Sequence, residues 1–236
     1  MQTYRFLSQI LLCLVILTFE GYSQTNDNQL FIIKNIKNYK KWLTNKPDSG
    51  ILPLKTMISP VYSEVPYQTK ENFTGQVLYH KHSFWVTKEA GEKLKLVQDS
   101  LKTLGLSLYF FDTYRPYAAT VKMWKIVSDD RYAANPANGS GHNRGVSVDV
   151  SLAEIKTGKP LQMPTGFDNF TDTAHHDFMN LSPEILENRS ILKGIMEHFG
   201  FRALSTEWWH YSLPDPKRYP LLNIPFKKLR KLQPLH

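Results

Sequence analysis

Three short segments of the chain contain residue types that do chemistry. The first, SGHNRGVSVD at residues 140–149, places His142 in a glycine-rich turn and Asp149 on the strand that follows. Valines alternate with polar residues along this strand, so we expect Asp149 on the face opposite the valines. An ionised carboxylate there is costly unless a cation compensates it, and both residue types are zinc ligands. The segment therefore fits a metal site, and it also fits a loop histidine followed by a hydrogen-bonding aspartate.

The second segment is EWWH at residues 207–210. Residues three apart on an ideal strand point to opposite faces, so we expect Glu207 in the turn before a strand and His210 on that strand. Two histidines and a carboxylate, with one position left open, form a catalytic zinc site. His210 would then bind the metal while Glu207 approaches the attacking water as a base. The alternative is an ordinary surface pair beside an aromatic core.

The third segment, DTYRP at residues 112–116, follows an apolar run and precedes a proline that suits the first turn of a helix. We therefore expect Arg115 to project from the end of the sheet. It could act as a fixed cation for a carboxylate or a developing oxyanion. The alternative is a salt bridge to Asp112.

The hydrophobic periodicity predicts a single α+β domain that positions these segments, with a central, partly antiparallel sheet flanked by helices and the site at the sheet. The long connection over residues 153–181 carries Phe167, Phe170 and Phe178, so we expect it to pack over other parts of the domain. The expected helices span residues 87–104, 116–127 and 182–199, and the expected strands span 106–111, 145–152 and 208–213.

The ends of the chain have a different composition. Residues 1–23 combine Arg5, an apolar run and small residues before Gln24, which predicts a cleaved signal peptide and an exported, periplasmic or secreted protein. An uncleaved membrane anchor is the alternative. Cys13 is the single cysteine of the chain. It would leave with the signal peptide, so the site must use nitrogen and oxygen ligands.

Three further segments complete the organisation of the chain. Residues 24–50 are polar and predict a flexible segment with at most one short helix, and residues 51–222 form the main domain. Residues 223–236 form a basic tail, for which weak contact with an anionic envelope and a simple solvated tail are both open. The formal net charge of +8 permits an anionic partner without requiring one.

Taken together, the segments resemble the zinc D-Ala-D-Ala metallopeptidases, which share an SxHxxGxAxD segment and a late ExxH. Ser140, His142, Gly145 and Asp149 occupy that frame, with Ser147 where alanine is common. Within the family, the dipeptidases of vancomycin resistance are the most similar group. Matching segments occur in the same order at residues 67–75, 112–116, 142–149, 166–176 and 207–211.

The resemblance implies one Zn²⁺ per chain, held by His142, Asp149 and His210. It implies that Glu207 is the general base and that Arg115 stabilises the tetrahedral oxyanion. Further roles implied by the resemblance are binding of the ammonium group of the substrate by Tyr67 and Asp168, and a contact near its other end by Ser140.

The implied activity is hydrolysis of the dipeptide D-Ala-D-Ala in the cell envelope, with a small dipeptide as the partner and no nucleic acid. Two alternatives stay open. One is a related zinc D,D- or L,D-carboxypeptidase that acts on peptidoglycan stem peptides, and the other is a zinc-binding wall-peptide module without activity.

Overall fold

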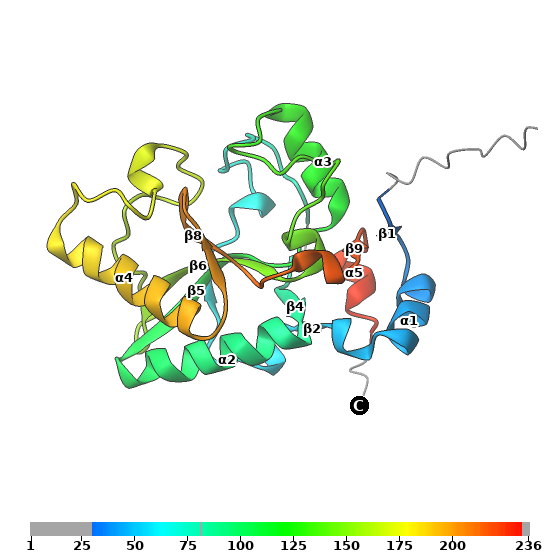
Figure 1. Cartoon of the computed structure of the whole chain (residues 1–236), viewed down its shortest axis with the longest axis horizontal. Helices are drawn as coiled ribbons and strands as arrows, with labels where there is room; N and C mark the ends of the chain where they lie inside the picture. The colour runs from blue at the N-terminus through cyan, green and yellow to red at the C-terminus, as the bar shows by residue number, and fades with distance from the viewer. Residues whose placement is uncertain (1–29, 81, 233–236) are drawn as a thin grey trace, which may run out of the picture.

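A computed structural model describes residues 30–80 and 82–232 of the chain (Figure 1). The expected signal peptide, residues 1–23, lies outside the described residues. The strands are β1 Ile32–Ile33, β2 Ile51–Pro53, β3 Tyr62–Ser63, β4 Trp85–Thr87, β5 Leu106–Asp112, β6 Ser147–Glu154, β7 Arg202–Leu204, β8 Glu207–Ser212 and β9 Leu221–Leu222. The helices are α1 Ile36–Asn45, α2 Lys88–Thr103, α3 Tyr117–Ile126, α4 Pro183–His198 and α5 Phe226–Leu229.

The main sheet has five strands in the order β3-β5-β6-β8-β7. Only β3 and β5 run parallel, and the other neighbours are antiparallel. Helices α2 and α4 lie along one face of this sheet (Figure 1). Val148, Val150 and Leu152 of β6 belong to the same apolar core as residues of α2 and α4, while the alternate β6 residues face the other way. The site residues are therefore on the face that α2 and α4 leave free.

The two long helices begin where the sequence indicates. The Thr87 side chain accepts a hydrogen bond from the Ala90 amide at the start of α2, and Ser182 does the same for Ile185 at the start of α4. Leu94, Val97 and Leu101 recur at helical spacing on α2 and are fully buried. The predicted α+β class with a partly antiparallel sheet is confirmed.

The two ends of the described chain fold against each other. Strand β1 pairs in parallel with β9, with Ile32 opposite Leu221. Tyr39 and Leu43 of α1 share an apolar cluster with Phe226 and Leu229 of α5.

This packing corrects the expectation of a flexible segment over residues 24–50, because residues 30–50 belong to the folded domain. It also corrects the expectation of a separate tail from residue 223 on, because α5 is part of the same cluster. The few apolar residues of both segments are spaced among lysines. The composition is therefore polar overall, and it did not predict that these segments pack into the domain. Residues 24–29 lie outside the described residues.

Within the described ranges, no helix has both the length and the apolar character needed to cross a membrane.

Candidate active site

The sheet places three ionisable residues in one row. Asp112 of β5 is the register partner of Asp149 of β6, and Asp149 is the register partner of His210 of β8. Residues directly opposite each other on neighbouring strands carry side chains on the same face. Two carboxylates side by side repel each other, so this row requires positive charge nearby.

His142 reaches the row from a short 3₁₀ helix, His142–Arg144, that precedes β6. Gly145 ends this turn with a φ of 69°, a left-handed conformation that favours glycine. At Gly141 a Cβ atom would collide with the side chain of Ser147. Both glycines are therefore needed to bring His142 against the sheet.

The ring of His142 has a fixed orientation. Its Nδ1 lies 2.8 Å from the carbonyl oxygen of Thr113. Because a carbonyl oxygen only accepts, Nδ1 carries the proton and the lone pair is on Nε2. A backbone partner of this kind orients many metal-binding histidines.

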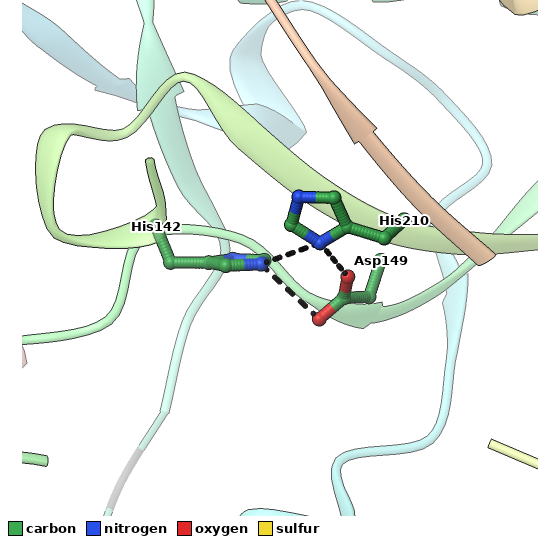
Figure 2. Close-up of side chains that lie close together, drawn as sticks. All are labelled: His142, Asp149 and His210. Atoms are coloured by element: carbon green, nitrogen blue, oxygen red, sulfur yellow. Dashed lines mark hydrogen bonds and ion pairs between the residues drawn. The ribbon is translucent and has the colours of Figure 1, made fainter. Parts of the chain in front are cut away.

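Three donor atoms converge at this point (Figure 2). His142 Nε2 lies 3.2 Å from His210 Nδ1 and 3.3 Å from Asp149 Oδ2. His210 Nδ1 lies 2.9 Å from Asp149 Oδ1. Two imidazole nitrogens and a carboxylate directed at one another suit a divalent cation such as zinc, so these residues fit a metal site.

The electrostatics of the row agree with this arrangement. Burial raises the pKa of Asp149, but His142 and His210 together lower it by a larger amount. The net pKa therefore lies below its usual range. Burial lowers the pKa of His210, and the contact with Asp149 raises it by more. Asp149 is therefore an ionised carboxylate between two histidines.

Arg115 supplies fixed positive charge beside the row. Its Nε and Nη2 atoms lie 2.8 and 2.7 Å from Asp112 Oδ2, and Nη2 lies 3.8 Å from Asp149 Oδ2. Burial lowers the pKa of Arg115, but Asp112 together with Tyr67, Tyr79 and Asp149 raises it by more, so the guanidinium stays charged. The structure therefore contains the salt bridge to Asp112 and also leaves Arg115 on the cavity wall.

Glu207 is the first residue of β8 rather than part of the turn before it. The pairing of β7 with β8 is irregular here, because Ala203 is opposite Tyr211 while Leu204 is opposite Glu207. This interruption allows Glu207 and His210 to line the same cavity. Burial raises the pKa of Glu207, and Asp149 raises it further against the opposing effect of His210.

Tyr67 and Asp168 meet on the wall of the cavity, although the chain separates them widely. The Tyr67 hydroxyl donates a hydrogen bond of 3.1 Å to Asp168 Oδ1. Asp168 Oδ2 is buried and has no hydrogen-bond partner among the described residues. Burial, followed by repulsion from Asp149, raises the pKa of Asp168 well above its usual range. Arg115 offsets only part of this effect, and Asp168 forms no ion pair with another described residue.

One cavity of about 350 Å³ brings the sequence-derived candidates together. Ser140 lines it, and its hydroxyl accepts a hydrogen bond of 3.2 Å from the His142 amide. The cavity is lined by all eight candidates: Tyr67, Arg115, Ser140, His142, Asp149, Asp168, Glu207 and His210.

Two further residues belong to the site: Asp112, to which the sequence assigned no role in it, and Trp209, because the sequence left open which of Trp208 and Trp209 lines the pocket. Asp112, considered only as a salt-bridge partner, also accepts a 2.8 Å hydrogen bond from the Tyr79 hydroxyl. This second contact fixes the carboxylate that holds Arg115 in place. Trp209 lines the cavity, whereas Trp208 lines a neighbouring one. Both tryptophans are 1% exposed, and nothing in their sequence context distinguishes them.

An aromatic wall closes one side of the cavity. Phe167, from the 153–181 connection, stacks on Phe111 at 4.6 Å and meets Tyr67 and Trp209 edge-on at 5.7 and 5.6 Å. Phe73 and Asp168 line this cavity and also a second cavity of about 640 Å³ beyond the wall. The connection therefore packs over the site as expected and separates two spaces.

This fold, with a half-buried glutamate beside a two-histidine, one-aspartate cluster, defines a metallopeptidase. A family profile described as D-Ala-D-Ala dipeptidase matches residues 47–229. The chain belongs to this family of metallopeptidases.

Curated relatives carry the same description. A D-alanyl-D-alanine dipeptidase of Escherichia coli is 31% identical over 172 residues, covering 73% of this chain and 89% of the relative. One of Enterococcus faecalis is 31% identical over 193 residues, covering 73% and 95%. One of Streptomyces coelicolor is 31% identical over 186 residues, covering 69% and 92%.

Proposed function

We propose that this protein is a zinc-dependent dipeptidase that hydrolyses D-Ala-D-Ala to two D-alanines in the cell envelope. The observation that carries the proposal is the convergence of His142 Nε2, His210 Nδ1 and the Asp149 carboxylate in a small cavity that Glu207 also lines. The names of the curated relatives support the substrate.

Zn²⁺ is the metal we assign to His142, Asp149 and His210. Two nitrogens and one carboxylate, without a thiolate, match the ligand sets of hydrolytic zinc sites. When bound, zinc supplies Lewis-acid activation of a water near neutral pH.

Glu207 is the group we assign to proton transfer. Its raised pKa matches a general base that accepts a proton from the attacking water and passes it to the leaving amine. Arg115 stays charged beside the same cavity, so it can stabilise negative charge on the carbonyl oxygen.

Asp168 and Tyr67 are the groups we assign to the ammonium end of the dipeptide. Asp168 Oδ2 is buried and finds no hydrogen-bond partner in the described part of the chain, and a substrate ammonium group would donate to it and favour its ionised form. Ser140, which lines the same cavity, is assigned to the other end of the substrate. The aromatic wall beside Asp168 leaves little room for a residue before the first D-alanine.

The deciding experiment measures metal content and hydrolysis on one sample. We expect about one zinc per chain, release of D-alanine from D-Ala-D-Ala, and no turnover of L-Ala-L-Ala. A chelator should abolish turnover and added zinc should restore it. A zinc-loaded protein that releases no D-alanine would refute the assigned substrate.

A zinc carboxypeptidase is the second candidate, and the 640 Å³ cavity beyond the wall is the observation that favours it. Such an enzyme needs room for the peptide that precedes the scissile bond. Release of terminal D-alanine from a muropeptide at a higher rate than from the dipeptide would select this function.

Export across the membrane is part of the proposal and depends on residues 1–23. Mass spectrometry of the protein recovered from the envelope fraction should show an N-terminus at Gln24. Recovery of the full chain in the cytoplasm would refute it.

A further inference from the structure

The net charge of the chain is concentrated at its two ends. Residues 30–46 hold five basic residues and residues 223–232 hold four, and neither segment holds an acidic residue. Nine of the 29 basic residues are thus in these segments, which leaves 20 basic against 21 acidic residues elsewhere. The +8 charge is therefore a property of two short segments rather than of the whole domain.

The fold brings these two segments together. The β1–β9 pairing and the shared apolar cluster hold α1 beside α5, at the end of the molecule opposite α4 (Figure 1). We call the exposed basic residues at this end of the molecule the terminal basic face. It consists of Lys34, Lys37, Lys40, Lys41, Lys46, Lys227, Lys228, Arg230 and Lys231.

The lysines of this face are exposed and unneutralised. All eight lysines of the face are exposed. None of them takes part in an ion pair within residues 30–80 and 82–232, whereas lysines elsewhere, such as Lys88 and Lys95, do. Lys37, Lys40 and Lys41 follow helical spacing on the side of α1 away from buried Tyr39 and Leu43. Such a cluster repels itself and gains most from an extended anionic partner.

An exposed aromatic pair adjoins the lysines. Phe31 is 63% exposed, and its ring centroid lies 5.5 Å from that of the partly buried Trp42. Aromatic side chains beside lysines are typical of surfaces that lie against lipid headgroups, where the rings enter the interface and the ammonium groups meet phosphate.

From the charge and the aromatic pair together, we infer that the terminal basic face docks the protein on a bilayer surface containing anionic phospholipid. Each lysine near such a surface contributes about 1 kcal/mol, or about fivefold in binding. None of the residues of the face lines the active-site cavity, so docking leaves that cavity open. The inference is independent of the dipeptidase assignment.

The test is sedimentation with vesicles of phosphatidylglycerol and phosphatidylcholine, and with vesicles of phosphatidylcholine alone. All preparations have the same N-terminus, verified by mass spectrometry. We expect binding to the anionic vesicles at low salt and loss of binding at about 1 M salt, where charges are screened within about 3 Å. Absence of binding to anionic vesicles at low salt would overturn the inference.

Matched variants separate the face from general charge. One variant changes Lys37, Lys40 and Lys41 to Gln, and its control changes the exposed Lys125, Lys156 and Lys159 to Gln. Both remove the same charge, and unchanged unfolding midpoints verify that both fold. We expect about 100-fold weaker binding for the first variant and only a small change for the control. Equal losses in the two variants would refute a specific face.

A third variant tests the lipid itself. Phe31→Ser should weaken binding to anionic vesicles several-fold without affecting retention on immobilised polyphosphate. If the wild-type protein binds polyphosphate but not vesicles, the face takes an anionic polymer and the lipid inference is wrong.

Discussion

At the scale of single residues, the site is a balance of charges on one sheet row. Asp112, Asp149 and His210 occupy neighbouring register positions, and Arg115 and His142 supply the compensating contacts. Asp112 holds Arg115 without lining the cavity itself. It therefore acts as a positioning residue.

Replacing Glu207 tests the proposed base. Glu207→Gln keeps the size of the side chain and removes its ability to accept a proton. We expect kcat to fall by about 10²–10⁴-fold with zinc content unchanged. Parallel metal analysis and D-alanine release give both quantities, and hydrolysis near the wild-type rate would exclude Glu207 as the base.

Replacing Asp112 tests the burial of Arg115. Asp112→Asn removes the nearer carboxylate from a buried guanidinium and leaves only the more distant Asp149, so we expect the free energy of unfolding to fall by about 3 kcal/mol. The control is Asp129→Asn, which breaks the exposed pair with Arg131 and should leave the free energy of unfolding almost unchanged. Urea unfolding of the metal-free proteins measures both, and similar small losses would contradict the role of Asp112.

The site residues could be predicted from the sequence because their chemistry is local. The turn before β6, the strand itself and the EWWH segment each place a residue type that binds metal or moves protons. Asp112 was harder to assign, because its role depends on register with Asp149, which only the pairing of β5 with β6 reveals. The same holds for Trp209. Near an irregular strand pairing, the adjacent residues in the sequence do not determine which side of the sheet a residue faces.

At the scale of elements, the 153–181 connection determines the size of the site. Its Phe167 lies between the site-lining rings of Tyr67 and Trp209 and the ring of Phe111. An element without regular structure thus forms the boundary between two cavities. The sequence predicted that this connection packs over part of the domain, and the structure shows that it packs against the wall of the active-site cavity.

Removing the Phe167 ring should join the two cavities. We expect Phe167→Ala to hydrolyse a tripeptide ending in D-Ala-D-Ala at least about tenfold faster than the wild type, while its kcat/KM for the dipeptide falls. Phe178→Ala, in the same connection but lining neither cavity, is the control. A variant that gains no tripeptide hydrolysis would show that Phe167 does not limit substrate length.

The long elements were predictable for a different reason than the short ones. Helices α2 and α4 have polar caps and a continuous apolar face, so local signals agree with packing. Strands β1 and β9 are two residues each and exist only through their mutual pairing. A two-residue strand carries no periodicity, and its partner lies at the other end of the chain.

At the scale of the whole molecule, acid stability depends on buried histidines. Burial lowers the pKa of His82 to about 4, against the opposing effect of Asp112. Burial also lowers the pKa of His176 to about 4. A folded-state pKa below the unfolded value means that protonation favours the unfolded chain, so stability is present above pH 6.5 and lost as the pH falls towards 4.

His82 should account for a measurable part of this loss. Its shift from 6.5 to about 4 corresponds to about 3 kcal/mol at 1.36 kcal/mol per unit. We expect His82→Phe to flatten the decline in unfolding free energy between about pH 7 and about pH 4.5. Urea titrations of metal-free wild type and variant provide the comparison, and parallel curves would contradict the assignment.

The parallel pairing of β1 with β9 also sets an order of events. Tyr39 and Leu43 cannot be fully covered until Phe226 and Leu229 are available, because the cluster that contains them draws on both ends of the chain. A chain that emerges from its N-terminus therefore keeps its first segment unpartnered until nearly all of its length is present. Completion of the fold requires residues near its C-terminal end, so the same contact that joins the ends also postpones folding during synthesis.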